Sequence, residues 1–143
     1  MYAKASFAIA AMFAGAAIGV APASPAPATQ MSGHYIAETT TAGGQSSTHD
    51  WYFTACGSGC ADVSFNGPAN PPFRAQLANG QWTVDATFDV SCSDGTWVPA
   101  SMKGHYVWDA TTLSGSAQLT YTQAACGNQP GTQSESLHLK PAT

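Results

Sequence analysis

Apolar and polar residues alternate along most of the chain after residue 30, and this period of two is typical of β-strands that bury one face. The clearest run is Gln81–Val90, in which Trp82 and every second residue after it are apolar, while the residues between them are Thr or Asp. No stripe with the 3.6-residue period of a helix follows residue 30. The pattern therefore predicts an all-β protein.

Short clusters of turn residues divide the alternating part of the chain into a series of hairpins. Asn79-Gly80, the preferred pair for a tight hairpin turn because both positions tolerate positive φ, separates two of the runs. The polar stretch Thr41–Thr48 is predicted to be a mobile loop. The predicted strands are Tyr35–Thr39, Asp50–Ala55, Ala61–Phe65, Phe73–Leu77, Gln81–Val90, Met102–Trp108, Leu113–Thr122 and Glu135–Leu139.

About eight strands with short links and no crossover helix favour a small antiparallel up-and-down β-barrel. A two-sheet β-sandwich is the alternative, because both arrangements hide the edges of the sheet. The hairpins follow one another directly and no long connection demands a Greek key, which favours the barrel.

Residues 1–28 have the composition of an export signal followed by a Pro/Ala spacer. Lys4 precedes an uncharged, mostly apolar stretch, Ala5–Val20, and small-residue cleavage patterns end at Ala23 and at Ala28. A retained membrane anchor is the alternative, but this stretch is shorter than the roughly 20 residues that span a bilayer. We therefore predict one β-domain over residues 29–143, secreted or associated with the cell envelope, with no stable membrane insertion once the leader is cleaved.

Charge is sparse, since only 8% of the residues are charged and the formal net charge is −4. The four basic residues are scattered along the chain: Lys4, Arg74, Lys103 and Lys140. A nucleic-acid partner is excluded, because neutralising phosphates needs clustered Lys and Arg.

The four cysteines behind an export signal predict disulfides, because the compartment is oxidising. Three pairings are possible, and the flexible Gly57-Ser58-Gly59 favours Cys56–Cys60, which leaves Cys92–Cys126. A metal site made by Cys56, Cys60 and His49 is the alternative, but it lacks a fourth ligand. We predict neither a metal nor a cofactor.

Candidate chemistry along the chain is limited. His49-Asp50 is the best catalytic fragment, but adjacent residues of a strand point to opposite faces. Among the aromatic residues, Tyr52 is out of phase with the apolar set of its strand, and Trp97 follows the Asp94-Gly95 turn, so both are candidates for ligand binding.

The leading hypothesis is an exported non-enzymatic domain that binds a protein partner or a small apolar molecule. A secreted hydrolase with a site around His49 and Asp50 is the alternative.

Several motifs resemble those of small exported actinobacterial disulfide-containing β-domain proteins, and similar domains lie outside some membrane serine/threonine kinases. The motifs are the run from Trp51 to Cys60, the single Cys92, the Trp108-Asp109 turn with Leu113-Ser114-Gly115, and Cys126-Gly127. The resemblance covers most of residues 33–139. It implies an extracytoplasmic location and a disulfide framework, and it brings no catalytic residues. A weaker resemblance to avidin-type and lipocalin-type barrels, through Gly33 and Tyr35, brings no ligand-binding set.

Overall fold

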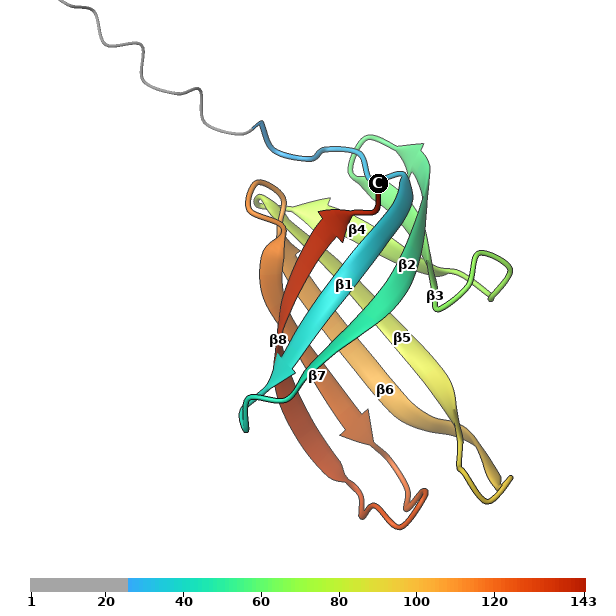
Figure 1. Ribbon diagram of the computed structural model, residues 1–143. Coiled ribbons are helices and arrows are strands. Elements are labelled where there is room, and N and C mark those ends of the chain that lie inside the picture. The colour runs from blue at the N-terminus through green and yellow to red at the C-terminus, as the bar shows by residue number, and fades with distance from the viewer. Residues whose placement is uncertain (1–25) are drawn as a thin grey trace, which may run out of the picture.

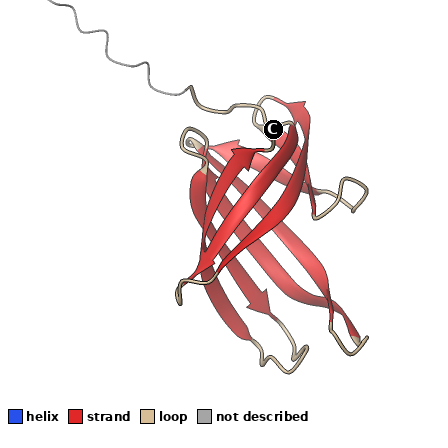
Figure 2. Cartoon of the chain, in the orientation of Figure 1, coloured by secondary structure: helices blue, strands red, loops and turns tan. Residues whose placement is uncertain are grey.

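The computed structural model describes residues 26–143, so most of the predicted leader, including its cleavage pattern at Ala23, lies outside the described residues. The described chain forms eight antiparallel strands and no helix (Figure 1, Figure 2). Within these residues no helix has the length and hydropathy needed to cross a membrane. The strands are β1 (Gly33–Thr41), β2 (Ser46–Gly57), β3 (Cys60–Phe65), β4 (Phe73–Ala78), β5 (Gln81–Ser91), β6 (Trp97–Asp109), β7 (Ser114–Tyr121) and β8 (Gly131–Pro141).

Each strand pairs with the next, and β8 returns to pair with β1 from Tyr35↔Pro141 to Thr41↔Glu135, which closes the barrel. The prediction of a small up-and-down barrel is confirmed, and the sandwich alternative is wrong. The Asn79-Gly80 hairpin is also confirmed, since Ala78 pairs with Gln81 around it. Both turn residues adopt positive φ, as that turn requires.

The loop predicted over Thr41–Thr48 is wrong in its second half. The connection is a short turn, and β2 begins at Ser46, which pairs with Thr40. Polar residues continue the strand here because pairing along the whole length of β1 outweighs their weak intrinsic preference for strands.

The alternation predicted from the sequence sorts side chains to the inside and outside of the barrel. On β5, Trp82, Val84 and Ala86 are buried in the core, while Asp85 between them is exposed. Aromatic rings supply much of the core, and the largest of them is shielded completely, since Trp82 has no exposed surface. The hydrophobic effect therefore acts on a single interior lined by all eight strands.

One end of the barrel, at the top in Figure 1, is closed by the segment Ala28–Met31 and by tight turns. Met31 is fully buried, and the Ala28 carbonyl accepts a 2.7 Å hydrogen bond from the indole Nε1 of Trp82. The same segment bonds to two turns, from Ala28 N to Ala110 O at 2.7 Å and from Gly59 N to Thr29 O at 2.9 Å. We call this the closed end.

Both predicted disulfides are present, and no cysteine among the described residues is free. Cys56–Cys60 spans the β2–β3 turn at the closed end. Cys92–Cys126 joins the β5–β6 turn to the β7–β8 loop at the opposite end. The metal alternative for Cys56 and Cys60 is therefore wrong, because thiolate ligation needs reduced cysteines. The two disulfides indicate an oxidising, extracellular environment, because disulfides form and persist there.

Candidate ligand-binding site

The barrel is open at the end opposite the Ala28–Met31 segment because its wall is uneven in height. Pairing between β2 and β3 stops at Trp51↔Phe65, and pairing between β4 and β5 stops at Ala75↔Val84. The strand β5 nevertheless continues to Ser91, paired only with β6. The wall is therefore low at β3 and β4, and we call this the open end.

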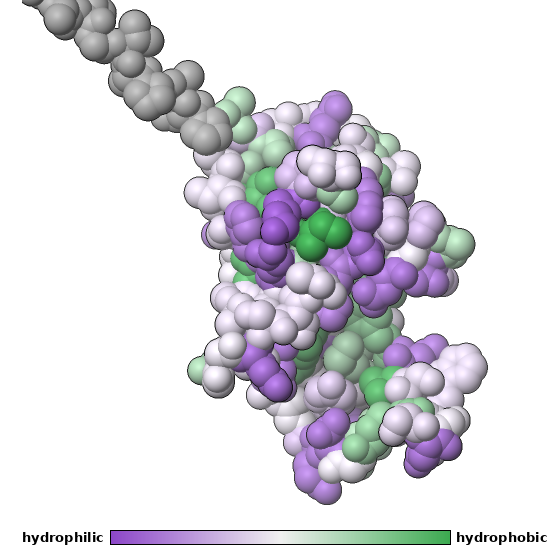
Figure 3. All heavy atoms as spheres, viewed as in Figure 1, coloured by the Kyte–Doolittle hydropathy of each residue, from purple (hydrophilic) through white to green (hydrophobic). Residues whose placement is uncertain are grey.

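A cavity of about 210 Å³ lies inside the open end. Four of the residues that line it are buried: Trp51, Thr39, Phe65 and Tyr106. Figure 3 shows a hollow in the lower half of the molecule. Hydrophobic atoms lie in the hollow, and more hydrophilic atoms surround it. The side chains that line the cavity come from seven of the eight strands and the β3–β4 loop: Thr39, His49, Trp51, Phe65, Asn66, Phe88, Asp89, Met102, Tyr106, Leu119 and Glu135.

A second hollow, of about 390 Å³, lies where the wall is low, between the β3–β4 loop and the unpaired edge of β5. Pro71 and Phe73 form one side of it, and Thr87 on β5 forms the other. The two hollows share four lining residues: Phe65, Asn66, Phe88 and Asp89. The two hollows therefore adjoin at the rings of Phe65 and Phe88, and we call this second hollow the side opening.

Four aromatic rings form a continuous apolar surface in the cavity. The ring centroid of Trp51 lies 4.8 Å from that of Phe65 and 5.0 Å from that of Tyr106. Phe65 in turn lies 5.1 Å from Phe88, toward the side opening. Edge-to-face contacts at these separations hold rings in fixed positions, so the lining is largely preformed.

Tyr106 is, with Thr39, one of the two buried residues with a hydroxyl group that line the cavity. Within residues 26–143 its hydroxyl makes no hydrogen bond, although the residue is nine-tenths buried. Burial raises the pKa of this phenol well above its usual value, and the negative charge of Glu135 raises the pKa further. Tyr106 is therefore a neutral hydrogen-bond donor facing the cavity, with no partner among the described residues.

The position of the Tyr106 ring depends on Gly104, two residues away on the same face of β6. A Cβ added at Gly104 would lie 2.5 Å from the edge of that ring. The absence of a side chain at this position lets the ring lie flat along the wall instead of filling the space of the cavity.

Glu135 reaches the cavity from β8, on the inward face that it shares with Leu137 and Leu139. Its carboxylate accepts a 2.8 Å hydrogen bond from Gln133 Nε2 and forms no ion pair within the described residues. The sequence-based candidates did not include this residue, although an acidic residue in phase with two buried leucines was a signal that could have identified it.

The two residues chosen from the sequence as ligand-binding candidates lie outside this cavity. Tyr52 is on the outer face of β2, where its ring stacks on His34 at 4.5 Å between centroids. Trp97 is 67% exposed at the start of β6 and pairs with Ser91 near the turn. The structure does not bring these two side chains together, since β2 and β6 are not neighbours in the barrel.

His49 and Asp50 point to opposite faces of β2, as their adjacency in a strand predicts. His49 lines the cavity, while Asp50 Oδ1 lies 2.7 Å from His34 Nε2 on the outer wall. Within residues 26–143 no three side chains of His, Cys, Asp or Glu are grouped so that they could hold a metal ion.

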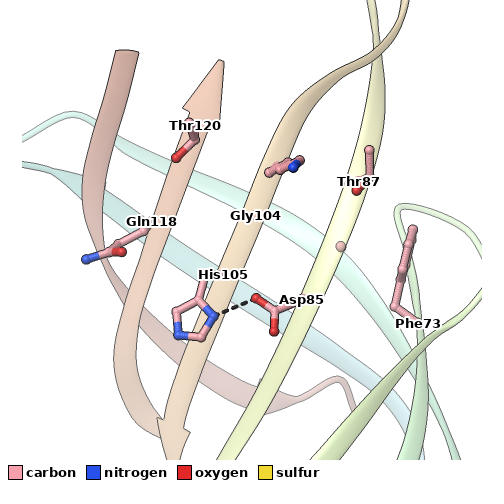
Figure 4. A pocket seen from close by; sticks show the side chains of 9 residues that line it. Phe73, Asp85, Thr87, Gly104, His105, Gln118 and Thr120 are labelled. Carbon is pink, nitrogen blue, oxygen red and sulfur yellow. Dashed lines mark hydrogen bonds and ion pairs between the residues drawn. The ribbon is translucent and has the colours of Figure 1, made fainter. Parts of the chain in front are cut away.

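A broader groove, of about 600 Å³, crosses the outer wall over β5, β6 and β7. Figure 4 shows His105 of β6 joined to Asp85 of β5, at 2.6 Å, and shows Gln118 and Thr120 on the neighbouring strand β7. This groove is open, and its lining mixes polar side chains, among them Lys103 and the His105–Asp85 pair, with Phe73 and Ala86. The interior cavity is therefore the better candidate for a ligand site, because it alone combines depth with an apolar lining.

Comparison with protein-family models, with curated proteins and with solved structures gave no match for this chain.

Proposed function

We propose that this protein is an exported binding domain that holds a small, mainly apolar molecule in the cavity at the open end of its barrel. The observation that carries the proposal is the cavity itself, lined by four aromatic rings and containing the unpartnered hydroxyl of Tyr106. Binding sites for small molecules have this composition, an apolar lining with a few polar groups that fix orientation.

The two disulfides support the exported location, because they persist in oxidising compartments. The apolar leader of the sequence supports it as well. The proposed role is binding, without catalysis, and it is independent of the predicted resemblance to actinobacterial β-domains. A secreted hydrolase that uses His49 remains the alternative function.

Tryptophan fluorescence tests the proposal directly, because Trp51 lies in the wall of the cavity. We expect a saturable change when short-chain alcohols or apolar dyes are titrated into the protein. The variant Leu119→Gln places a polar amide in the cavity, and it should weaken binding about thirtyfold, since burying a leucine side chain contributes about 2 kcal/mol.

Thr120→Gln is the matched control, because the next residue of β7 carries the same new side chain on the outer wall. It should leave the affinity unchanged. A protein that shows no saturable change with any probe, or equal losses in the two variants, contradicts the proposal. Turnover of ester probes that is lost in His49→Ala would instead favour the hydrolase.

A further inference from the structure

The acidic residues of this barrel differ in whether a basic residue balances them. Four of them pair with a basic side chain on the outer wall: Glu38 with Lys140, Asp50 with His34, Asp62 with Arg74, and Asp85 with His105. Glu135 faces inward and forms no such pair within the described residues. The lining of the cavity holds two carboxylates, those of Glu135 and Asp89, and one imidazole, that of His49, and it contains neither Lys nor Arg.

The aromatic rings add to the negative electrostatic potential that the two carboxylates create in the cavity. The faces of Trp, Tyr and Phe rings carry partial negative charge and attract cations that come within about 6 Å of the ring centroid. Trp51, Phe65, Phe88 and Tyr106 all line the same cavity as the carboxylate of Glu135. Glu135 also acts on Tyr106 in the same cavity, since its charge adds to the effect of burial in raising the pKa of the phenol.

Asp89 is the less important of the two carboxylates. It lies at the rim near the side opening, where its Oδ1 accepts a 2.7 Å hydrogen bond from the backbone N–H of Ala100. That bond links β5 to β6, so the Asp89 carboxylate already serves to join the two strands. Glu135 is bound only by the side chain of Gln133, so its carboxylate still has room for another donor.

We infer that the molecule held in the cavity is an amphipathic cation, with a protonated amine or quaternary ammonium group beside Glu135 and an apolar body along the aromatic rings. The inference rests on the proposed function and names the class of ligand for the same site. The apolar body would extend past Phe65 and Phe88 toward the side opening, where Pro71 and Phe73 continue the apolar surface.

The experiment compares three probes of equal chain length and different charge, each below its micelle concentration: octyltrimethylammonium, octanol and octanoate. We expect octyltrimethylammonium to bind about tenfold more tightly than octanol, and octanoate to bind most weakly. In Glu135→Gln the preference for the cation should fall below about threefold, while the affinity for octanol stays unchanged.

Glu38→Gln is the matched control, because it removes the same charge from the outer face of β1. Equal losses of cation affinity in the two variants would overturn the inference, since overall charge would then explain them. Octanol that binds as tightly as octyltrimethylammonium would overturn it while leaving the apolar site intact. If none of the three probes binds, the proposed function fails as well. Near-UV circular dichroism verifies that both variants keep the native packing.

Discussion

The two ends of this barrel are built from the same strands and the same alternating pattern, yet one is packed solid and the other is hollow. At the closed end Trp82 stacks on Trp108 with centroids 6.3 Å apart, and Ala28–Met31 covers both the interior and the turns. At the open end Phe88 is only partly buried, and polar groups such as Glu135 face inward. The comparison teaches that alternation decides which residues face inward, while strand length and terminal segments decide whether the interior is filled.

The largest effect that tests this comparison is the removal of one aromatic ring from each end. Trp82→Ala should lower the free energy of unfolding by about 3–5 kcal/mol, because it leaves a cavity in a packed region. Phe88→Ala should cost less than half as much, because its ring already borders open space. Urea denaturation measures both, and equal costs would show that the two ends are packed alike.

Removal of the disulfides tests how each end is held. On the loop-entropy account, replacing Cys92 and Cys126 by Ser should cost about 4 kcal/mol, because that bond closes a loop with a sequence separation of 34. Replacing Cys56 and Cys60 should cost about 2 kcal/mol, because their separation is 4. Thermal unfolding of the two double variants checks the order, and the reverse order would mean that packing at the closed end depends on its short bridge.

Truncation of the N-terminal segment has the smallest expected effect. A chain that starts at Thr29 lacks the carbonyl of Ala28, so the buried indole N–H of Trp82 loses its acceptor. We expect it to be about 1–3 kcal/mol less stable than a chain that starts at Ser24. Of the two predicted cleavage positions, the one after Ala23 therefore suits the fold better. Mass spectrometry of protein collected from the medium of an expressing culture tests the proposed export and the cleavage position together, and a chain starting at Thr29 with full stability would contradict the role of Ala28.

Much of the fold could be predicted from the sequence because the signals are local. The Asn79-Gly80 turn, the phase of Trp82 and Val84, and the flexible tripeptide between Cys56 and Cys60 each act within a few residues. The extent of β2 could not be predicted, because Ser46 joins that strand only through its pairing with β1.

The candidate site was harder to predict than the fold. Tyr52 and Trp97 were chosen for their expected exposure, whereas the cavity is formed inside the barrel by residues from strands far apart in the sequence. Its existence depends on where the pairing of β3 and β4 ends relative to β5. The register of strand pairing around the whole barrel determines these end points, and they cannot be predicted from the sequence of any single strand.

The side opening has a consequence for how quickly a bound molecule could be exchanged. The edge of β5 beyond Val84 has no partner strand within the described residues, so a gap in the wall already leads from solvent to the aromatic rings. For the proposed ligand, passage at this point requires the rings of Phe65, Phe73 and Phe88 to turn aside, but no strand to separate. Under the proposed function, residence time then depends on the strength of the ligand's contacts and on the motion of these three rings, and not on the opening of the barrel.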